Sequence, residues 1–428
     1  MKNPMGKPIL YRARFLLPIS APPLENGALL VDGGHIIAVD TFNNLTAAHP
    51  GAAVIDFGDT ALLPPMVNAH THLELSAFAD WAAKTAEPAA PHDFVDWILW
   101  LVRVRRSISA EQLYASLAAG LRASLLAGTG AVGDTFTGFG SVSAYQHSPL
   151  HGRVFAEVLG HEPAVVADHL AAIAKLLEHH PGPSLDWGLS PHAPYTLSSA
   201  ATDQVFAFAG RQSLQCSIHL AESTDETAFL QNGSGAIAEK LYAMAKWNST
   251  ADSIPGCRPV TAFCKKGRLR HGDLAVHGVQ VEAAEIDLLK QTGCIVVLCP
   301  RSNAALHVGK APVAAYLKAG VPLALGTDSL ASSSSLSIWD EMAFAGHWFH
   351  GEAGPREWLE IATLGGARAL GLHGRMGQLT PGCDASFQVV ALPEMPCINE
   401  LEEALCAAGA DIEITHLYLA SRNVLPGT

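Results

Sequence analysis

The spacing of apolar residues along the chain follows two patterns, one at both ends of the chain and another in the middle. Near the N-terminus, short apolar runs alternate with turn signals, a pattern typical of β-strands. In GALLVDGGHIIAVD, two apolar runs flank Gly33-Gly34, which predicts a hairpin. The same pattern returns near the C-terminus in GQLTPGCDASFQVVAL and IEITHLYLASRNVL. We therefore expect residues 1–62 and 376–428 to pair into one small composite β-sandwich domain.

The middle of the chain, residues 63–375, alternates β-rich apolar runs with Ala/Leu/Glu-rich stretches of helical spacing, such as SAEQLYASLAAGLRASLLAG. Strand and helix alternation with eight strands predicts an α/β fold, a (β/α)8 TIM barrel. A doubly wound open sheet is the alternative, although no GxGxxG motif follows the first strand. The eight runs are the one ending at His70 and those at 131–136, 152–160, 185–194, 214–222, 274–279, 294–302 and 323–329.

The first of these runs, PMVNAHTHLEL, ends in His70-Thr71-His72. Residues i and i+2 of a strand point to the same face, so both imidazoles would project together. A chain can offer two nitrogen ligands to one metal in this way. The pair alone is weak evidence, because two ordinary loop histidines produce the same pattern.

Polar residues at the ends of later runs complete a candidate site, because the C-terminal ends of barrel strands converge on one face. Three imidazoles and one carboxylate suit Zn²⁺ with a position left for water. A metal can lower the pKa of bound water to about 7. A second carboxylate nearby could then transfer a proton. The residues concerned are His192, His219, Glu222, His277 and Asp328.

Each of these residues has an ordinary structural interpretation. A strand-end histidine often bonds a backbone carbonyl, Asp328 in GTDS could cap a helix, and Glu222 could be a first-turn acid. All of these interpretations must hold at once for the site to vanish. The histidines in helical stretches, by contrast, are expected at the surface; they include His179, His180, His347 and His350.

Composition narrows the class of protein. A net charge of −13 argues against nucleic acid as the main partner. There is no run of roughly 20 apolar residues, so no membrane span is expected. The N-terminus does not resemble a signal peptide, and the eight cysteines are scattered without a CxxC pattern. Reduced cysteines and a cytoplasmic location are therefore expected.

Several motifs together resemble the amidohydrolase superfamily, in the branch of cytosine deaminase, chlorohydrolases and S-adenosylhomocysteine/methylthioadenosine deaminases. They are PPMVNAHTHLELS, SPHAPYTLS, IHLAES, CPRSN and GTDSLASSSSLSIWDEM, and the resemblance covers nearly the whole chain. One departure is Ser386, where the family usually has Asp. The resemblance implies one divalent metal, zinc or iron, held by His70, His72, His219 and Asp328.

The resemblance also implies roles in a hydrolytic deamination at C6 of an adenine-type nucleoside by metal-bound hydroxide. His277 would hold or deprotonate the water, and Glu222 would protonate the ring nitrogen. Asp328 would pass the water's proton to the leaving ammonia. A metal-free barrel that only binds a ligand is the non-enzymatic alternative. A bridging carboxylated lysine is not expected, because the fourth strand ends in His192.

The resemblance implies a small-molecule nucleoside as the substrate, and HTHLELS and CPRSN are most similar to aminodeoxyfutalosine deaminases of menaquinone biosynthesis. S-adenosylhomocysteine or methylthioadenosine ranks second, and a chloro- or aminotriazine third. Relatives place an acid 26–30 residues after the first metal histidine for the ribose hydroxyls, and Asp96 is the candidate here. Arg301 could bind a substrate carboxylate or form a structural salt bridge. Relatives are often dimers, so a homodimer is possible. The expected substrate contacts are His192, Glu74, Asp96, Trp97, Ser76 and Arg301.

Overall fold

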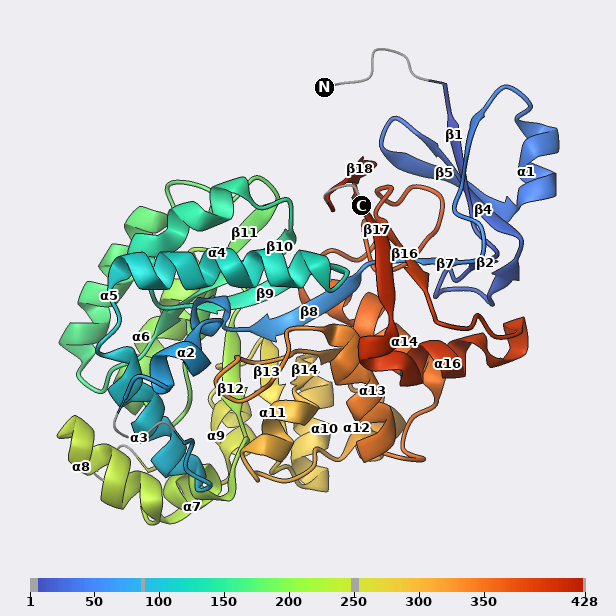
Figure 1. The fold of residues 1–428 in the computed structure, drawn as a ribbon. Helices are drawn as coiled ribbons and strands as arrows, with labels where there is room; N and C mark the ends of the chain where they lie inside the picture. The colour runs from blue at the N-terminus through green and yellow to red at the C-terminus, as the bar shows by residue number, and fades with distance from the viewer. Residues whose placement is uncertain (1–6, 86–88, 248–253, 426–428) are drawn as a thin grey trace.

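The middle of the chain closes into a barrel of eight parallel strands (Figure 1). The computed structural model describes residues 7–85, 89–247 and 254–425. Two four-stranded sheets form the wall, and single bridges close its seams, Leu189 to Cys216 and Thr71 to Asp328. Every predicted run overlaps one strand, so the TIM-barrel prediction is confirmed. The strands are β8 (Met66–Thr71), β9 (Thr129–Phe136), β10 (His151–Val158), β11 (Leu185–Pro191), β12 (Ser217–Leu220), β13 (Leu274–His277), β14 (Ile295–Leu298) and β15 (Leu323–Leu325).

Helices cover the outside of the barrel and bury their apolar stripes against it. In α4, Ser109 and Gln112 form a capping box that fixes the first turn, while Leu117 and Leu121 face the core. The helices of the barrel are α2 (Phe78–Ala82), α3 (Phe94–Arg105), α4 (Ala110–Leu126), α5 (Pro163–Leu176), α6 (Ser199–Arg211), α7 (Thr224–Asn232), α8 (Tyr242–Ala245), α9 (Pro259–Lys265), α10 (Ala283–Thr292), α11 (Pro300–Ala305), α12 (Val313–Ala319), α13 (Ile338–Trp348), α14 (Pro355–Glu360) and α15 (Gly366–Ala369).

Short 3₁₀ and π segments extend several of these connections. The segments are η1 (Leu73–Leu75), η2 (Phe139–His147), η3 (Ile237–Leu241) and η5 (Ile361–Gly365).

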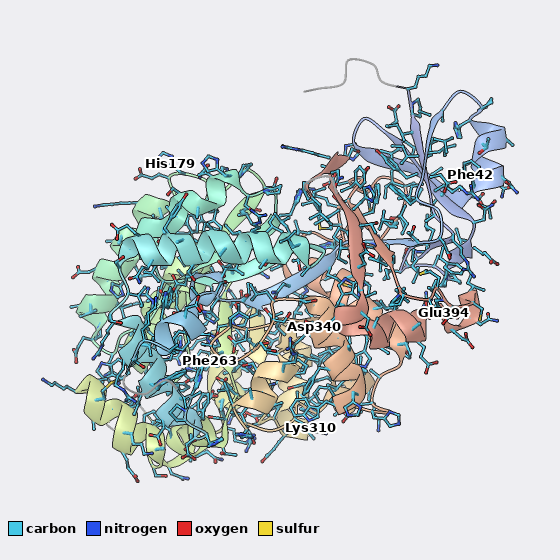
Figure 2. The ribbon with its side chains drawn as sticks, viewed as in Figure 1. Phe42, His179, Phe263, Lys310, Asp340 and Glu394 are labelled. Atoms are coloured by element: carbon cyan, nitrogen blue, oxygen red, sulfur yellow. The ribbon has the colours of Figure 1, made fainter. Side chains whose placement is uncertain are left out.

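Side chains fill both the barrel and the space between strands and helices (Figure 2). All residues of β13, β14 and β15 are buried, as expected for parallel strands covered on both faces. His179 lies at the outer surface (Figure 2), and His180, His347 and His350 are also exposed, so the surface prediction for these histidines is confirmed. Within the described ranges, no helix is long and apolar enough to cross a membrane.

Two further sheets lie beside the barrel, one built from the N-terminal end alone and one that combines both ends of the chain (Figure 1). One has the order β5-β4-β1-β6, and the other β18-β17-β16-β7-β2-β3. β16 pairs with β7, so the predicted pairing of the two ends is confirmed. The predicted hairpin is present, with Gly33 and Gly34 at positive φ as a two-residue turn requires.

These sheets carry few helices. The strands are β1 (Ile9–Arg12), β2 (Phe15–Leu16), β3 (Leu24–Glu25), β4 (Gly27–Asp32), β5 (His35–Thr41), β6 (Ala53–Asp56), β7 (Ala61–Leu63), β16 (Phe387–Ala391), β17 (Glu413–Leu419) and β18 (Arg422–Asn423), and the helical segments are α1 (Phe42–Ala48), η6 (Ile398–Glu400), α16 (Leu401–Ala408) and η7 (Gly409–Asp411).

Candidate metal centre and active site

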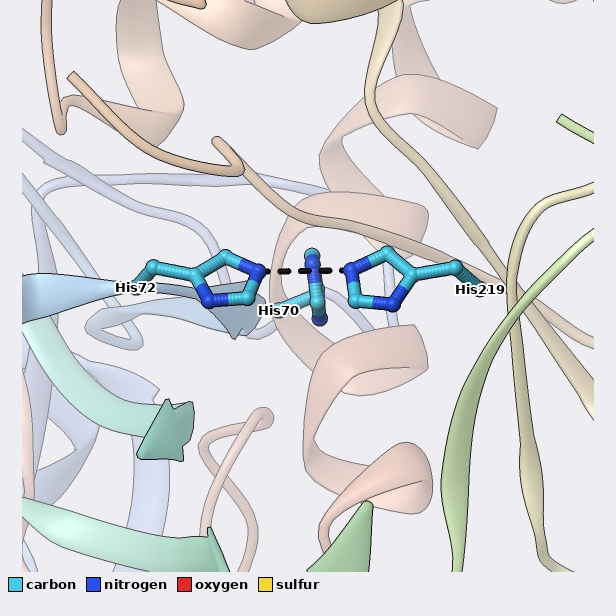
Figure 3. Close-up of side chains that lie close together, drawn as sticks. All are labelled: His70, His72 and His219. Atoms are coloured by element: carbon cyan, nitrogen blue, oxygen red, sulfur yellow. Dashed lines mark hydrogen bonds between the residues drawn. The ribbon is translucent and has the colours of Figure 1, made fainter. Parts of the chain in front are cut away.

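Three imidazoles meet where β8 and β12 end at the mouth of the barrel (Figure 3). The ring of His70 stands nearly perpendicular to those of His72 and His219, which face each other with Nε2 atoms 3.3 Å apart. One nitrogen from each ring lies within 4.8 Å of the others. Two nitrogens bound tetrahedrally to one zinc ion lie about 3.3 Å apart, given Zn–N bonds of about 2.0–2.1 Å. The spacing therefore fits one shared cation.

The hydrogen bonds of the cluster also fit a metal. His219 donates its Nδ1 proton to the carbonyl oxygen of His192 at 2.7 Å, which leaves Nε2 with a free lone pair. Neither ring nitrogen of His70 has a hydrogen-bond partner among the described residues, although both are buried. Such orphaned groups are costly unless something else satisfies them. A divalent cation would do so, and the neutral imidazoles suit it.

Asp328 supplies a carboxylate to the same cluster. Its Oδ1 lies 3.7 Å from Nε2 of His70 and 3.6 Å from Nε2 of His72. Its Oδ2 instead accepts hydrogen bonds from the hydroxyls of Ser302 and Ser332, at 2.6 and 2.9 Å. The two serines therefore orient the carboxylate so that one oxygen faces the imidazoles.

The backbone is bent to deliver these side chains. Ala221, His277 and Asp328 all have positive φ, of 55°, 74° and 56°, directly after β12, at the end of β13 and just beyond β15. Residues other than glycine adopt this conformation at a cost, and they do so most often at functional sites. Gly326 is needed nearby, because a Cβ atom there would lie 2.7 Å from the carbonyl oxygen of His70.

Glu222 and His277 form a second pair beside the metal cluster. Oε1 of Glu222 lies 3.5 Å from Nε2 of His277, whose Nδ1 pairs with Oδ1 of Asn303 at 2.8 Å. The amide oxygen of Asn303 can only accept, so His277 carries its proton on Nδ1 and turns a lone pair toward the site. Glu226 accepts hydrogen bonds from the backbone N–H groups of Ala221 and Glu222, which fixes the loop that carries Glu222.

Burial shifts the pKa values of the histidines and of Glu222 in opposite directions. It lowers the pKa of His72 to about 3 and that of His192 to about 4, so both imidazoles are neutral. Burial raises the pKa of Glu222 well above its usual value, which favours a carboxyl group that carries a proton. Burial also opposes ionisation of Asp328, but the nearby imidazoles of His70, His72 and His277 hold its pKa well below the usual range.

A cavity of about 440 Å³ opens in front of the cluster. Its lining includes His72, His219, Glu222, His277 and Asp328, together with many apolar side chains. Among the predicted substrate contacts, the lining residues are His192, Glu74 and Trp97.

Three other predicted substrate contacts are not among the residues that line this cavity. Asp96 is not a lining residue of this cavity, and its carboxylate forms an ion pair with Lys240 at 2.7 Å. Ser76 donates its hydroxyl proton to the carbonyl of Leu73 at 2.7 Å, as a turn residue. Arg301 lines a separate surface hollow and bonds Ser334 there.

The sequence analysis missed several residues of the site. Glu226 had a visible signal, because Ser223 and Glu226 have the Ser-x-x-Glu spacing of a helix start, and Ser223 does cap α7. Glu157 had a weaker one, as a charged residue within the apolar run VFAEVLG. Ser302 and Ser332 lay inside quoted motifs, but nothing in the sequence indicated which oxygen of Asp328 they would bind.

Comparison with known proteins agrees with this geometry. The fold and the residue cluster define a candidate metal-dependent hydrolase. The sequence pattern of the amidohydrolase family matches residues 61–420, and the chain belongs to this family. The prediction of a hydrolytic enzyme of the deaminase type is confirmed. A second pattern, the bacterial imidazolonepropionase-like composite domain, matches residues 27–52.

Individual relatives align over most of the chain. Aminodeoxyfutalosine deaminase of Deinococcus radiodurans is 31% identical over 357 residues, 81% of each chain. A 5-methylthioadenosine/S-adenosylhomocysteine deaminase of Nitratidesulfovibrio vulgaris is 30% identical over 410 residues, 92% of this chain and 86% of the relative. An adenosine deaminase of Xanthomonas campestris, solved with bound zinc, superposes with a TM-score of 0.79 at 26% identity, covering 98% of this chain and 93% of the other.

Proposed function

We propose that the protein deaminates an adenine-type nucleoside at C6 by hydrolysis, using one divalent metal held by His70, His72, His219 and Asp328. The observation that carries this proposal is the buried pair of Glu222 and His277 in the same cavity as the metal cluster. The metal is zinc in the leading version and iron in the alternative. When bound, it supplies Lewis-acid activation of a water molecule.

Each proton transfer is assigned to a particular residue of the chain. Glu222, which burial keeps protonated, donates to the ring nitrogen next to the attacked carbon. His277 accepts a hydrogen bond from the attacking water through Nε2, and Asp328 takes one proton of this water and gives it to the departing amine. The other proton, left on the oxygen at C6, returns to Glu222 as the carbonyl forms. A C–O bond forms, the C–N bond breaks, and ammonia leaves.

The leading substrate is aminodeoxyfutalosine, because the relative with that activity is 31% identical. Methylthioadenosine or S-adenosylhomocysteine is the second candidate, supported by a relative that aligns over 92% of the chain. A chloro- or aminotriazine is third. Hydrolysis of each of these substrates would use the same catalytic residues, so the residue cluster does not discriminate among the substrates.

Ammonia release tests this proposal. The metal-replete protein is incubated with aminodeoxyfutalosine, methylthioadenosine, S-adenosylhomocysteine and a chlorotriazine, and turnover is compared. Fastest release from aminodeoxyfutalosine is expected. Turnover of methylthioadenosine with aminodeoxyfutalosine inert would reject the leading substrate. No turnover of any compound by protein that contains a full equivalent of metal would favour a barrel that only binds a ligand.

We also propose that residues 1–62 and 376–428 form the composite β-sandwich domain and residues 63–375 the catalytic barrel. The pairing of β16 with β7 and the composite-domain match at 27–52 support this division. Limited proteolysis should cut near the two junctions first. Early cleavage inside the barrel, with the junctions intact, would contradict the division.

A further inference from the structure

A second hollow, with a volume of about 760 Å³, opens at the end of the barrel opposite the metal cluster. Its lining comes from the segments that lead into β12, β13, β14 and β15, and from α15 and the turn after it. Arg153 reaches it from β10, on the same strand face as Phe155 and Glu157. Because Phe155 is fully buried, β10 presents Glu157 to the mouth and Arg153 to the floor, with an apolar side chain between them.

The chain satisfies the guanidinium of Arg153 only in part. Nη1 donates to the carbonyl of Trp187 at 2.6 Å, which is its one hydrogen bond to a described residue, and Nε is buried without any such partner. The one described carboxylate that attracts this cation belongs to Asp186, which is 64% exposed and forms no salt bridge with it. Burial lowers the pKa of Arg153, but an arginine stays charged in proteins. Arg153 therefore brings a positive charge to the hollow without a carboxylate in contact to balance it.

Two further arginines line the same hollow. Arg270 directs Nε and Nη2 at Asp273, whereas its Nη1 forms no hydrogen bond with a described residue. Arg368 pairs with Glu360 at 3.4 Å, but both side chains are about half exposed, and such pairs are weak. Among the described residues, the lining thus contains three arginines and one carboxylate, that of Asp273. This local excess of positive charge contrasts with the net charge of −13 for the whole chain.

Glycines leave two of these guanidiniums uncovered. A Cβ atom at Gly371 would lie 3.7 Å from Nη2 of Arg153, and one at Gly210 would lie 3.8 Å from Nη1 of Arg270. The positive φ of Gly371 requires glycine in any case. Gly210 has no such requirement, because it lies within α6, where glycine is a poor helix former. Its lack of a side chain keeps the space in front of Arg270 open.

We propose that this hollow, which we call the floor site, binds the phosphate group of a small molecule through Arg153 and Arg270. Guanidinium groups bind phosphate oxygens with paired N–H donors. A phosphate dianion also matches the excess of positive charge better than a single carboxylate would. The volume of the hollow falls within the range of small-molecule sites, about 300–1,000 Å³. The floor site is separate from the proposed deamination, because the metal cluster lies at the other end of the barrel.

Isothermal titration calorimetry on the full metal-loaded chain tests the proposal, with sodium chloride of equal ionic strength as the blank. The probes are inorganic phosphate and glycerol 3-phosphate. Two charge-assisted hydrogen bonds imply saturable binding with a dissociation constant of about 1 mM. Tighter binding of glycerol 3-phosphate would identify a phosphate ester as the occupant, and tighter binding of inorganic phosphate would identify the free ion. No saturation by either probe at about 20 times the expected dissociation constant overturns the proposal.

Arg153→Met removes the charge and keeps an apolar side chain, and it should weaken phosphate binding by at least about 10-fold. The matched control is Arg122→Met, because Arg122 is an exposed arginine of α4 outside the hollow. This control should bind phosphate like the wild type. Ammonia release by Arg153→Met should be unchanged, so failure of the floor site and failure of the proposed deamination are measured separately.

A second pair of variants leaves all three arginines in place. Gly210→Glu puts a carboxylate in front of Arg270 and should weaken phosphate binding by at least about 10-fold. Gly210→Gln adds a side chain of similar size without the charge and should weaken binding less. If Arg153→Met does not fold, this pair decides, and equal affinity in Gly210→Glu and Gly210→Gln rejects the proposal.

Phosphate bound at the metal cluster would give the opposite pattern. Its binding would persist unchanged in Arg153→Met and would be lost from His219→Ala, which removes a proposed metal ligand. That result overturns the floor site. Binding that is retained in His219→Ala and weakened in Arg153→Met supports it.

Discussion

Buried polar groups at the two ends of the barrel can be compared through Asp273 on the floor and His70 at the mouth. At the N-terminal floor, Asp273 lies just before β13 and accepts hydrogen bonds from the backbone N–H groups of Cys216 and Arg270, and from the guanidinium of Arg270. At the mouth, buried atoms of His70 and Glu157 have no partner among the described residues. The chain itself satisfies Asp273, which serves stability, whereas His70 and Glu157 face the site and are left for what binds there.

This contrast predicts that substitutions at the mouth change metal content or rate, and substitutions at the floor change stability. His219→Ala should have the largest effect, because it removes a ligand from the centre of the cluster. Most bound metal and the activity that depends on it should be lost, as measured by metal analysis and ammonia release. The matched control is His151→Ala, a buried histidine at the start of β10 on the floor, which should keep its metal. Unchanged metal content in His219→Ala would place His219 outside the ligand set.

Glu222→Gln separates proton transfer from metal binding. The amide keeps the shape of the side chain but cannot donate the proton that burial retains on the carboxyl group. Turnover should fall by about 10²–10⁴-fold with the metal content unchanged. Denaturant unfolding should show no loss of stability, because functional groups at such sites are seldom optimised for it. A near-normal rate would remove the proton-transfer role.

Asp273→Ala should lower the stability of the fold and leave the catalytic rate unchanged. Two backbone N–H groups lose their acceptor, and the free energy of unfolding should fall by about 2–4 kcal/mol. The rate per folded, metal-loaded molecule should stay the same. Asp203→Ala offers a control, because this aspartate pairs with Arg268 while 60% exposed and should cost less than about 1 kcal/mol. A large loss of kcat in folded Asp273→Ala would break the distinction between the two ends.

Ser302→Ala should have the smallest effect. Asp328 loses one of its two hydroxyl donors and keeps Ser332. Metal affinity should weaken by about 10-fold, measured by competition with a chelator. Ser124→Ala is the control, since this buried serine bonds only within α4, to Gly120. Equal affinity in both variants would mean that the serines do not orient the carboxylate.

The sequence predicts the barrel and its ligand cluster for a physical reason. A short apolar run marks each barrel strand, and the C-terminal ends of parallel strands must converge, so residues such as His70, His219 and Asp328 are placed by topology alone. The position of Asp96 is harder to predict, because this residue lies on a helix. The direction in which α3 turns this side chain depends on Lys240, 144 residues away. No local pattern carries that information.

Glu157 illustrates the same limit from the other side. Its charge inside an apolar run is visible in the sequence. The sequence does not show that Oε1 of this side chain lacks a hydrogen-bond partner among the described residues. An absent partner is a property of the packed cavity, and spacing along the chain does not record it.

The seam between β8 and β15 has a consequence for how the protein is made. Thr71 donates its hydroxyl proton to the carbonyl of Asp328 across 257 residues, and Asp328 donates its backbone N–H to His70. At a synthesis rate of about 5–20 residues per second, His70 and His72 leave the ribosome about 13–50 s before Asp328 does. During that interval a nascent chain holds only part of its metal ligands, next to an open sheet edge. When the segment after β15 pairs with β8, the barrel therefore closes and the proposed metal ligands come together in the same step.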